Sequence, residues 1–345
     1  VASGGAWSLD LATATPAAGS LALNTNGANP VSITATDAAG NVSSAGSQTL
    51  VIDTTAPTTP AVTSPTLTNA PAPVLSGTAE ADSTVTVTIG GATYTIVASG
   101  GAWSLDLATA TPVTGSLALD TNGANPVSIT ATDAAGNVSS ATTQTLVIDT
   151  TAPTMPAVTS PTLTNAPTPM LSGTAEAGST VTVTIGGATY TTVASGGTWS
   201  LDLATATPVT GSLALDTNGA NPVSVTSTDT AGNVSSATTQ TLVIDTTAPT
   251  TPAVTSPTLT NAPAPVLSGT AEADSTVTVT IGGATYTSVA SGGAWSLDLA
   301  TATPAAGSLA LNTNGANPVS VTATDAAGNV SSAGSQTLVI DTTAP

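Results

Sequence analysis

The charged side chains in this sequence are all carboxylates, and their spacing is the first indication of chemistry. There are 19 Asp and Glu residues, and the chain contains no Lys, Arg, His or Cys. Carboxylate, hydroxyl and amide oxygens are suitable ligands for a hard cation such as Ca²⁺. The usual catalytic bases and activated nucleophiles are missing, so we expect the protein not to be an enzyme.

The charge balance excludes several classes of partner. With a formal net charge of −19, the chain has no side-chain cation to hold nucleic acid phosphates or an anionic membrane surface. The sequence contains no run of about 18 apolar residues, so we expect no direct membrane insertion. Two carboxylates about 4 Å apart repel by about 4 kcal/mol at an effective dielectric constant of about 20. Acids that cluster therefore need a bound cation, backbone amides or a proton.

The acids recur with an internal repeat. The motif DTTAP begins at four positions 96 residues apart, namely Asp53, Asp149, Asp245 and Asp341. This period divides the chain into a partial repeat, 1–52, and three complete repeats, 53–148, 149–244 and 245–345, the last with the start of the next linker. Residues 1–52 match the second half of a repeat. We therefore expect that the sequence is part of a longer protein and that this partial repeat is poorly packed.

The elements that position the acids are predicted by an apolar–polar alternation with a period of two. In 83–95, Val and Ile alternate with Thr, and Gly90-Gly91 has the composition of a two-residue hairpin turn. Further strands are expected at 73–80, 102–108, 125–133 and 138–148. About seven strands in roughly 100 residues predict an all-β fold of tandem immunoglobulin-like β-sandwiches, in an elongated array.

Strands that alternate in direction would bring several acidic loops to the same end of each sandwich. In the first complete repeat these acids are Asp53, Glu80, Asp82 and Asp133. Their equivalents are Asp149, Glu176 and Asp229 in the second repeat and Asp245, Glu272, Asp274 and Asp325 in the third. Several carboxylates on flexible loops favour a structural calcium site. The alternative is that they are solvated turn residues, with Asp133 capping its own turn.

Three other residue types have a structural and a functional interpretation. Trp103 shares its strand face with two leucines, which favours a core position over a sugar-stacking one. Tyr94 has the parity of position 96, which is Ile, Thr or Ser in the three repeats, so Tyr94 is a better candidate for a surface contact than Trp103, although a lone tyrosine on a strand is usually structural. The NVS at Asn137 matches a glycosylation sequon, but its place beside a turn favours a role in that turn.

Four motifs in combination suggest a family. VIDTTAP at each junction, LSGTAE, GGAWSLDL and VTATDAAGNVSS resemble the tandem bacterial Ig-like domains of giant, type I-secreted surface adhesins, over essentially the whole chain. The resemblance implies extracellular modules on the bacterial cell surface, stacked as a stalk that supports cell adhesion and biofilm formation. It also implies calcium between adjacent repeats, held by the DTTAP aspartates and by the equivalents of Glu80 and Asp133. Receptors would be bound by other regions of the parent protein.

Two functions from other classes remain open at this point. An array of carbohydrate-binding modules, in a secreted polysaccharide-acting protein, would need exposed aromatic side chains, and the sequence offers few. An enzyme built on paired carboxylates would need a distinct pocket segment, whereas the acids recur in every repeat. We therefore favour a structural extender segment.

Overall fold

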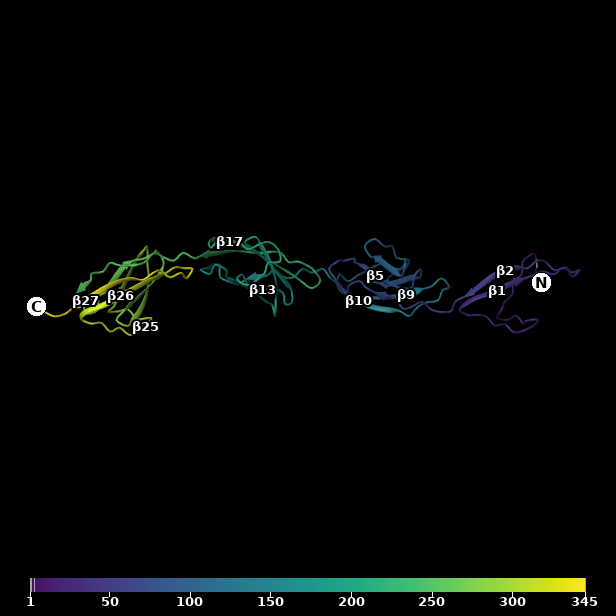
Figure 1. Ribbon diagram of the computed structural model, residues 1–345, viewed down its shortest axis with the longest axis horizontal. Coiled ribbons are helices and arrows are strands. Elements are labelled where there is room, and N and C mark those ends of the chain that lie inside the picture. The colour runs from purple at the N-terminus through teal and green to yellow at the C-terminus, as the bar shows by residue number, and fades with distance from the viewer. Residues whose placement is uncertain (1, 3, 345) are drawn as a thin grey trace. The chain divides into compact units, whose positions relative to one another are not determined.

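The computed structural model describes residue 2 and residues 4–344, and the regular elements in this part of the chain are β-strands (Figure 1). The chain divides into two compact units, Val1–Thr151 and Ala152–Pro345. The first unit holds the partial repeat and the first complete repeat, and the second holds the other two. Among the described residues, no helix is long and apolar enough to cross a membrane.

The first complete repeat forms two sheets that share one core. The smaller sheet has the order β3-β5-β8, formed by Ala61–Val62, Val74–Thr78 and Ala102–Asp106. The larger sheet has the order β4-β10-β9-β6-β7, formed by Leu67–Thr68, Thr142–Asp149, Asn122–Thr132, Thr84–Ile89 and Ala92–Val97. Buried side chains from both sheets make one apolar cluster. The predicted β-sandwich is therefore confirmed.

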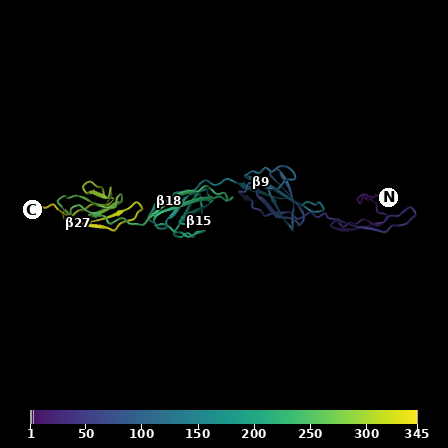
Figure 2. The same cartoon turned by 90° about the horizontal axis from the view of Figure 1, so that it is seen from above.

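The second repeat has the same arrangement, and the third adds the short strand β25 beside β23 in its larger sheet; Figure 2 shows β15 and β18 of the second repeat. The second repeat comprises β11 (Ala157–Val158), β12 (Leu163–Thr164), β13 (Met170–Thr174), β14 (Thr180–Ile185), β15 (Ala188–Val193), β16 (Thr198–Asp202), β17 (Asn218–Thr228) and β18 (Thr238–Asp245). The third comprises β19 (Ala253–Val254), β20 (Leu259–Thr260), β21 (Val266–Thr270), β22 (Thr276–Ile281), β23 (Ala284–Val289), β24 (Ala294–Asp298), β25 (Ala306–Gly307), β26 (Asn314–Thr324) and β27 (Gly334–Asp341).

The first strand of each sandwich is divided between the two sheets. In the first complete repeat, β3 pairs with β5 in the smaller sheet, and β4 runs parallel to β10 in the larger one. Pro65 lies between these two short strands. Proline has no backbone N–H for a ladder, so it favours a break at this point. This repeat therefore has eight strand segments rather than about seven.

The hairpin of β6 and β7 determines which side chains point inward. Gly90 and Gly91 have φ values of +53° and +78°, as a two-residue hairpin turn requires. The turn pairs Val87 with Tyr94, and paired residues share a sheet face. Tyr94 is consequently only 2% exposed. The structural alternative for Tyr94 is therefore confirmed and the surface alternative was wrong, because parity was judged from position 96, where Ile96 itself packs partly against the core.

The tryptophan of each complete repeat lies in the core, as expected. Trp103 is 3% exposed and pairs with Gly77 across β5 and β8. A Cβ at Gly77 would lie 2.7 Å from the Trp103 ring and 1.9 Å from the carbonyl oxygen of Ala61. Glycine is therefore required for the close approach of the indole to the sheet.

The partial repeat has a different environment around its tryptophan. Its strands β1 (Gly27–Ile33) and β2 (Gly46–Ile52) form a two-stranded sheet. Trp7 is 56% exposed, whereas the equivalent Trp103 lies on β8 of the smaller sheet and is buried in the core of its own repeat. The described part of 1–52 is thus less well packed than the complete repeats.

Candidate metal site and junction

Four of the predicted metal ligands line a single hollow in the first complete repeat. Asp53, Glu80, Asp82 and Asp133 surround a volume of about 440 Å³. Asp53 follows β2, Glu80 and Asp82 lie between β5 and β6, and Asp133 follows β9. Loops distant in sequence thus meet here, as the strand directions predicted.

Asp133 is held by the turn that it begins. Its Oδ1 accepts the backbone N–H of Asn137 at 2.8 Å, and its Oδ2 accepts the Asn137 side-chain amide at 2.8 Å. The side-chain hydrogen bond from Asn137 is the largest cause of a pKa below the usual value for this carboxyl, although desolvation acts the other way. The carboxylate is therefore charged at neutral pH. Asp325 makes the same two bonds with Asn329 in the third repeat.

The linker aspartate is engaged through its backbone as well as its side chain. Asp53 Oδ1 accepts the N–H of Thr55 at 2.9 Å, which closes a local turn. The carbonyl oxygen of Asp53 accepts the side-chain amide of Asn137 at 3.0 Å. In the third repeat, Asn329 donates to the carbonyl oxygen of Asp245 at 2.7 Å. One asparagine therefore closes a turn in its own domain and holds the linker that precedes it.

The two acids between β5 and β6 differ in their backbone conformations and in their occurrence among the repeats. Asp82 has a φ of +63° and Asp274 a φ of +65°, in the left-handed region that favours glycine. The second repeat has Gly178 at this position, with a φ of +84°. Glu80 accepts the hydroxyl of Ser83 through its backbone carbonyl at 2.7 Å. The second repeat therefore offers one carboxylate fewer.

The residues fit calcium in donor type but do not form a preassembled cage. All the side-chain donors are oxygens on loops, which is the ligand chemistry of Ca²⁺. Among the described residues, however, no group of three or more acids is close enough to share one ion. Glu80 and its neighbours would therefore need side-chain rotation, water or backbone carbonyls to complete a shell.

The equivalent acids of the third repeat lie in one compact unit, whereas those of the second repeat are divided between the two units. Asp245, Glu272, Asp274 and Asp325 all belong to the second compact unit, with the Asn329 contact described above. Asp149 belongs to the first unit, whereas Glu176 and Asp229 belong to the second. The grouping of these last three acids stays a prediction.

A second set of junction contacts was missed by the sequence reasoning. Asn122, the first residue of β9, accepts through its Oδ1 the N–H of Thr150 at 2.9 Å and the hydroxyl of Thr151 at 3.0 Å. The hydroxyl of Thr150 also lies 3.0 Å from this oxygen. We call this set the asparagine clamp; it recurs in full around Asn218 and Asn314, and around Asn26 with the contacts of Thr54. The signal was present, since the triplet TNG recurs with the same 96-residue period as DTTAP.

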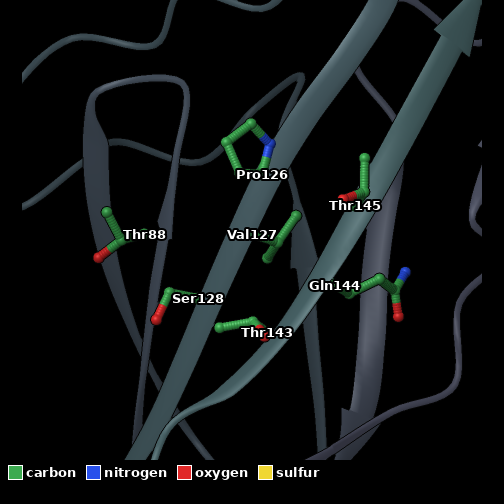
Figure 3. Close-up of a pocket in the computed structure, with 7 residues that line it drawn as sticks. All are labelled: Thr88, Pro126, Val127, Ser128, Thr143, Gln144 and Thr145. Carbon is green, nitrogen blue, oxygen red and sulfur yellow. The ribbon is translucent and has the colours of Figure 1, made fainter.

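The outer face of the larger sheet carries a shallow groove without acidic or aromatic side chains (Figure 3). Its lining residues are Thr88, Pro126, Val127, Ser128, Thr143, Gln144 and Thr145. A similar groove lies over β14, β17 and β18. With Trp103, Trp199 and Trp295 buried, neither groove offers the aromatic platform that stacking on a sugar requires.

Comparison with known proteins gives one family match. The bacterial Ig-like domain model, Big_13, matches residues 59–150, 157–246 and 251–342. No curated protein matches the chain.

Three solved structures illustrate the similarity. A structure of a 1.5-MDa bacterial ice-binding adhesin is 30% identical, over 78% of this chain and 90% of that one, with a TM-score of 0.29. The FN1–FN3 domains of chicken CNTN1 are 11% identical, over 83% and 99%, with a TM-score of 0.34. Fibronectin(III)-like modules of Clostridium thermocellum CbhA are 15% identical, over 54% and 94%, with a TM-score of 0.35. All three TM-scores lie below 0.5, so the assignment of the modules rests on the three sequence segments that match the family model.

Proposed function

The chain belongs to the bacterial Ig-like domain family, and on this premise we propose that it is an extender segment of a bacterial cell-surface adhesin. The observation that carries the proposal is the tandem repetition itself. The first two complete repeats differ at only nine of 96 positions, as expected for copies of one structural unit. Such modules are typically structural, and we assign the chain no enzymatic role. The 30% sequence identity to an adhesin supports this proposal.

The proposed mechanism is mechanical. A sandwich with strands of about ten residues spans roughly 34 Å, so three complete repeats would project a distal domain by about 100 Å. The chain would act outside the cell, with its neighbouring repeats as partners and its receptor bound elsewhere in the parent protein. Adhesion and biofilm formation would be the outcome.

We further propose that calcium stiffens the junctions. In the first complete repeat the ion would be held by Glu80, Asp82, Asp133 and the linker residue Asp53. In the third, the ligands would be Asp245, Glu272, Asp274 and Asp325, and in the second Asp149, Glu176 and Asp229. A bound dication would offset the repulsion between these carboxylates, which no side-chain cation in the sequence can do.

One experiment with the full chain tests both the extender role and the stiffening of the junctions by calcium. Small-angle scattering measures the maximum dimension in calcium and in chelator, and thermal melting is followed in parallel. A compact particle in both conditions would contradict the extender role. Calcium at about 100 times its Kd would stabilise each site by about 2.7 kcal/mol.

Matched variants distinguish the calcium site from nonspecific charge effects. Glu272→Gln together with Asp325→Asn should abolish the calcium response of the third repeat. Asp298→Asn removes one charge from β24, outside the proposed ligands, and should leave that response unchanged. Equal responses in all variants would reject calcium while leaving the extender role standing.

A further inference from the structure

The asparagine clamp is built on a chemically labile pair of residues. Asn26, Asn122, Asn218 and Asn314 are each followed directly by glycine. In an Asn-Gly pair, the backbone nitrogen of the glycine can attack the asparagine side-chain amide, because glycine has no Cβ to hinder the approach. Other asparagines of the repeat, such as Asn125 and Asn137, precede proline and valine and lack this feature.

The fold explains why both members of the pair are present. A Cβ at Gly123 would lie 2.2 Å from Oδ2 of Asp120, and a Cβ at Gly219 would lie 2.2 Å from Oδ2 of Asp216. A larger residue would therefore displace this carboxylate, so glycine leaves the aspartate in place. On the other side, Asn218 Oδ1 accepts the N–H and the hydroxyl of Thr246 at 2.9 and 3.0 Å, and the hydroxyl of Thr247 at 3.1 Å. The linker is therefore held by the side-chain carbonyl oxygen of the asparagine.

We propose that these four Asn-Gly pairs are sites of spontaneous deamidation whose rate is set by opening of the clamp. The glycine backbone nitrogen forms a bond to Cγ of the asparagine. The Cγ–Nδ2 bond breaks, and the proton from the glycine nitrogen leaves with the departing ammonia. Water then opens the cyclic imide at either carbonyl, which gives aspartate or isoaspartate. Water is the only co-reactant, and each asparagine side chain is exposed to it.

The closed clamp opposes ring closure in two ways. Asn218 and Gly219 pair with Asp245 and Ile244 along β18, so the backbone is held extended. The side-chain carbonyl is held on Thr246 and Thr247, and Cγ must leave these donors to reach the following nitrogen. Opening of the linker releases both restraints together.

Modification would be irreversible and would alter the junction. Isoaspartate adds one atom to the main chain and breaks the register between β17 and β18. Aspartate at position 218 adds a carboxylate close to Asp216 and opposite Asp245, in a chain without side-chain cations. An opened junction would therefore not fully reclose, and the fraction of modified residues would record how often each junction had opened.

The test compares deamidation rates in the full folded chain by peptide mapping and isoaspartate-specific labelling. The variant is Thr246→Val with Thr247→Val, and the matched control is Thr246→Ser with Thr247→Ser, which keeps both hydroxyls. We expect the Val variant to deamidate about thirtyfold faster at Asn218, the factor that corresponds to the loss of two ordinary hydrogen bonds. The rates at Asn26, Asn122 and Asn314 should be unchanged, and the Ser variant should match the parent.

Two outcomes would overturn the proposal. One is an Asn218 rate that is the same or slower in the Val variant, which would mean that the threonines polarise the amide for attack rather than restrain it. The other is a folded chain that deamidates as fast as the denatured chain at all four pairs. Circular dichroism and tryptophan emission check that each variant is folded, so a rate increase cannot be ascribed to loss of the domain.

Discussion

Asp82 and Asp274 are proposed calcium ligands, but their backbone conformation is one that favours glycine. Both have a positive φ, where the second repeat has Gly178. In chelator, we expect Asp82→Gly with Asp274→Gly to stabilise the protein by about 0.5 kcal/mol, because glycine adopts this conformation without steric cost. In calcium the same change should reduce the ion-dependent gain. Denaturant titration in both conditions measures the difference, and an identical shift in both would remove Asp82 and Asp274 from the ligand set.

Gly269 lies at a point of the third repeat where the backbone and the tryptophan ring leave no room for a side chain. A Cβ there would lie 1.9 Å from the carbonyl oxygen of Ala253 and 2.7 Å from the Trp295 ring. Gly269→Ala should therefore destabilise the third repeat by about 1–3 kcal/mol, the usual range for overpacking. Ala294→Thr is the control, since the second repeat carries Thr198 at this position. Thermal melting followed by tryptophan emission reports both, and equal melting of the two variants would contradict the packing argument.

Single-residue burial was predictable where a strand had one clear apolar face. The alternation of Val and Thr in 83–95 and the leucines beside Trp103 predicted the core correctly. Tyr94 was misplaced because the tolerance of position 96 was taken as a sign of exposure. The hairpin register, available from Gly90-Gly91, pairs Tyr94 with Val87 and would have placed it inside.

At the scale of elements, the turn from Asp133 to Asn137 connects β9 to β10 and should control acid stability. Its hydrogen bonds depress the pKa of Asp133 in the folded protein, so the stabilisation is present above the unfolded pKa of about 3.9. This stabilisation is lost as the pH falls through the lower pKa that Asp133 has in the folded protein.

We therefore expect melting temperature to be nearly constant from neutral pH to about pH 5 and to fall below about pH 4. Replacing Asp133, Asp229 and Asp325 by Asn should flatten this acid limb, measured in chelator so that ion binding does not contribute. An unchanged acid limb in that variant would assign it to other carboxylates.

The elements around the site were predictable to different degrees. The direction of each strand placed Asp53, Glu80, Asp82 and Asp133 at the same end of the sandwich, where they line one hollow, because sandwich connections leave few alternatives; their role as metal ligands stays a prediction. The asparagine clamp was not predicted, because the 96-residue period that TNG shares with DTTAP does not say which of their residues are in contact. Only the ladder between β9 and β10 brings Asn122 beside Thr150.

At the scale of the whole molecule, charge should make stability depend on salt with an unusual sign. Added salt often weakens surface ion pairs, but this chain has a formal charge of −19 and no basic side chain. Raising ionic strength from 0.01 to 0.1 M shortens the screening length from about 30 to about 10 Å and reduces the repulsion among the acids.

We expect potassium chloride to raise the melting temperature of the full chain in chelator, with most of the change at low ionic strength. A fall in melting temperature over this range would show that repulsion is not the main electrostatic contribution. The test is independent of calcium, because no divalent ion is present.

The asparagine that joins a turn to the preceding linker has a consequence for how such a protein changes over generations. The residues involved are the same in every copy: Asn41, Asn137, Asn233 and Asn329 in the turn, and the aspartate of each DTTAP. Any copy can therefore follow any other without a new interface. Unequal recombination within the gene could lengthen or shorten the protein by whole domains, and each product would inherit junctions that already fit.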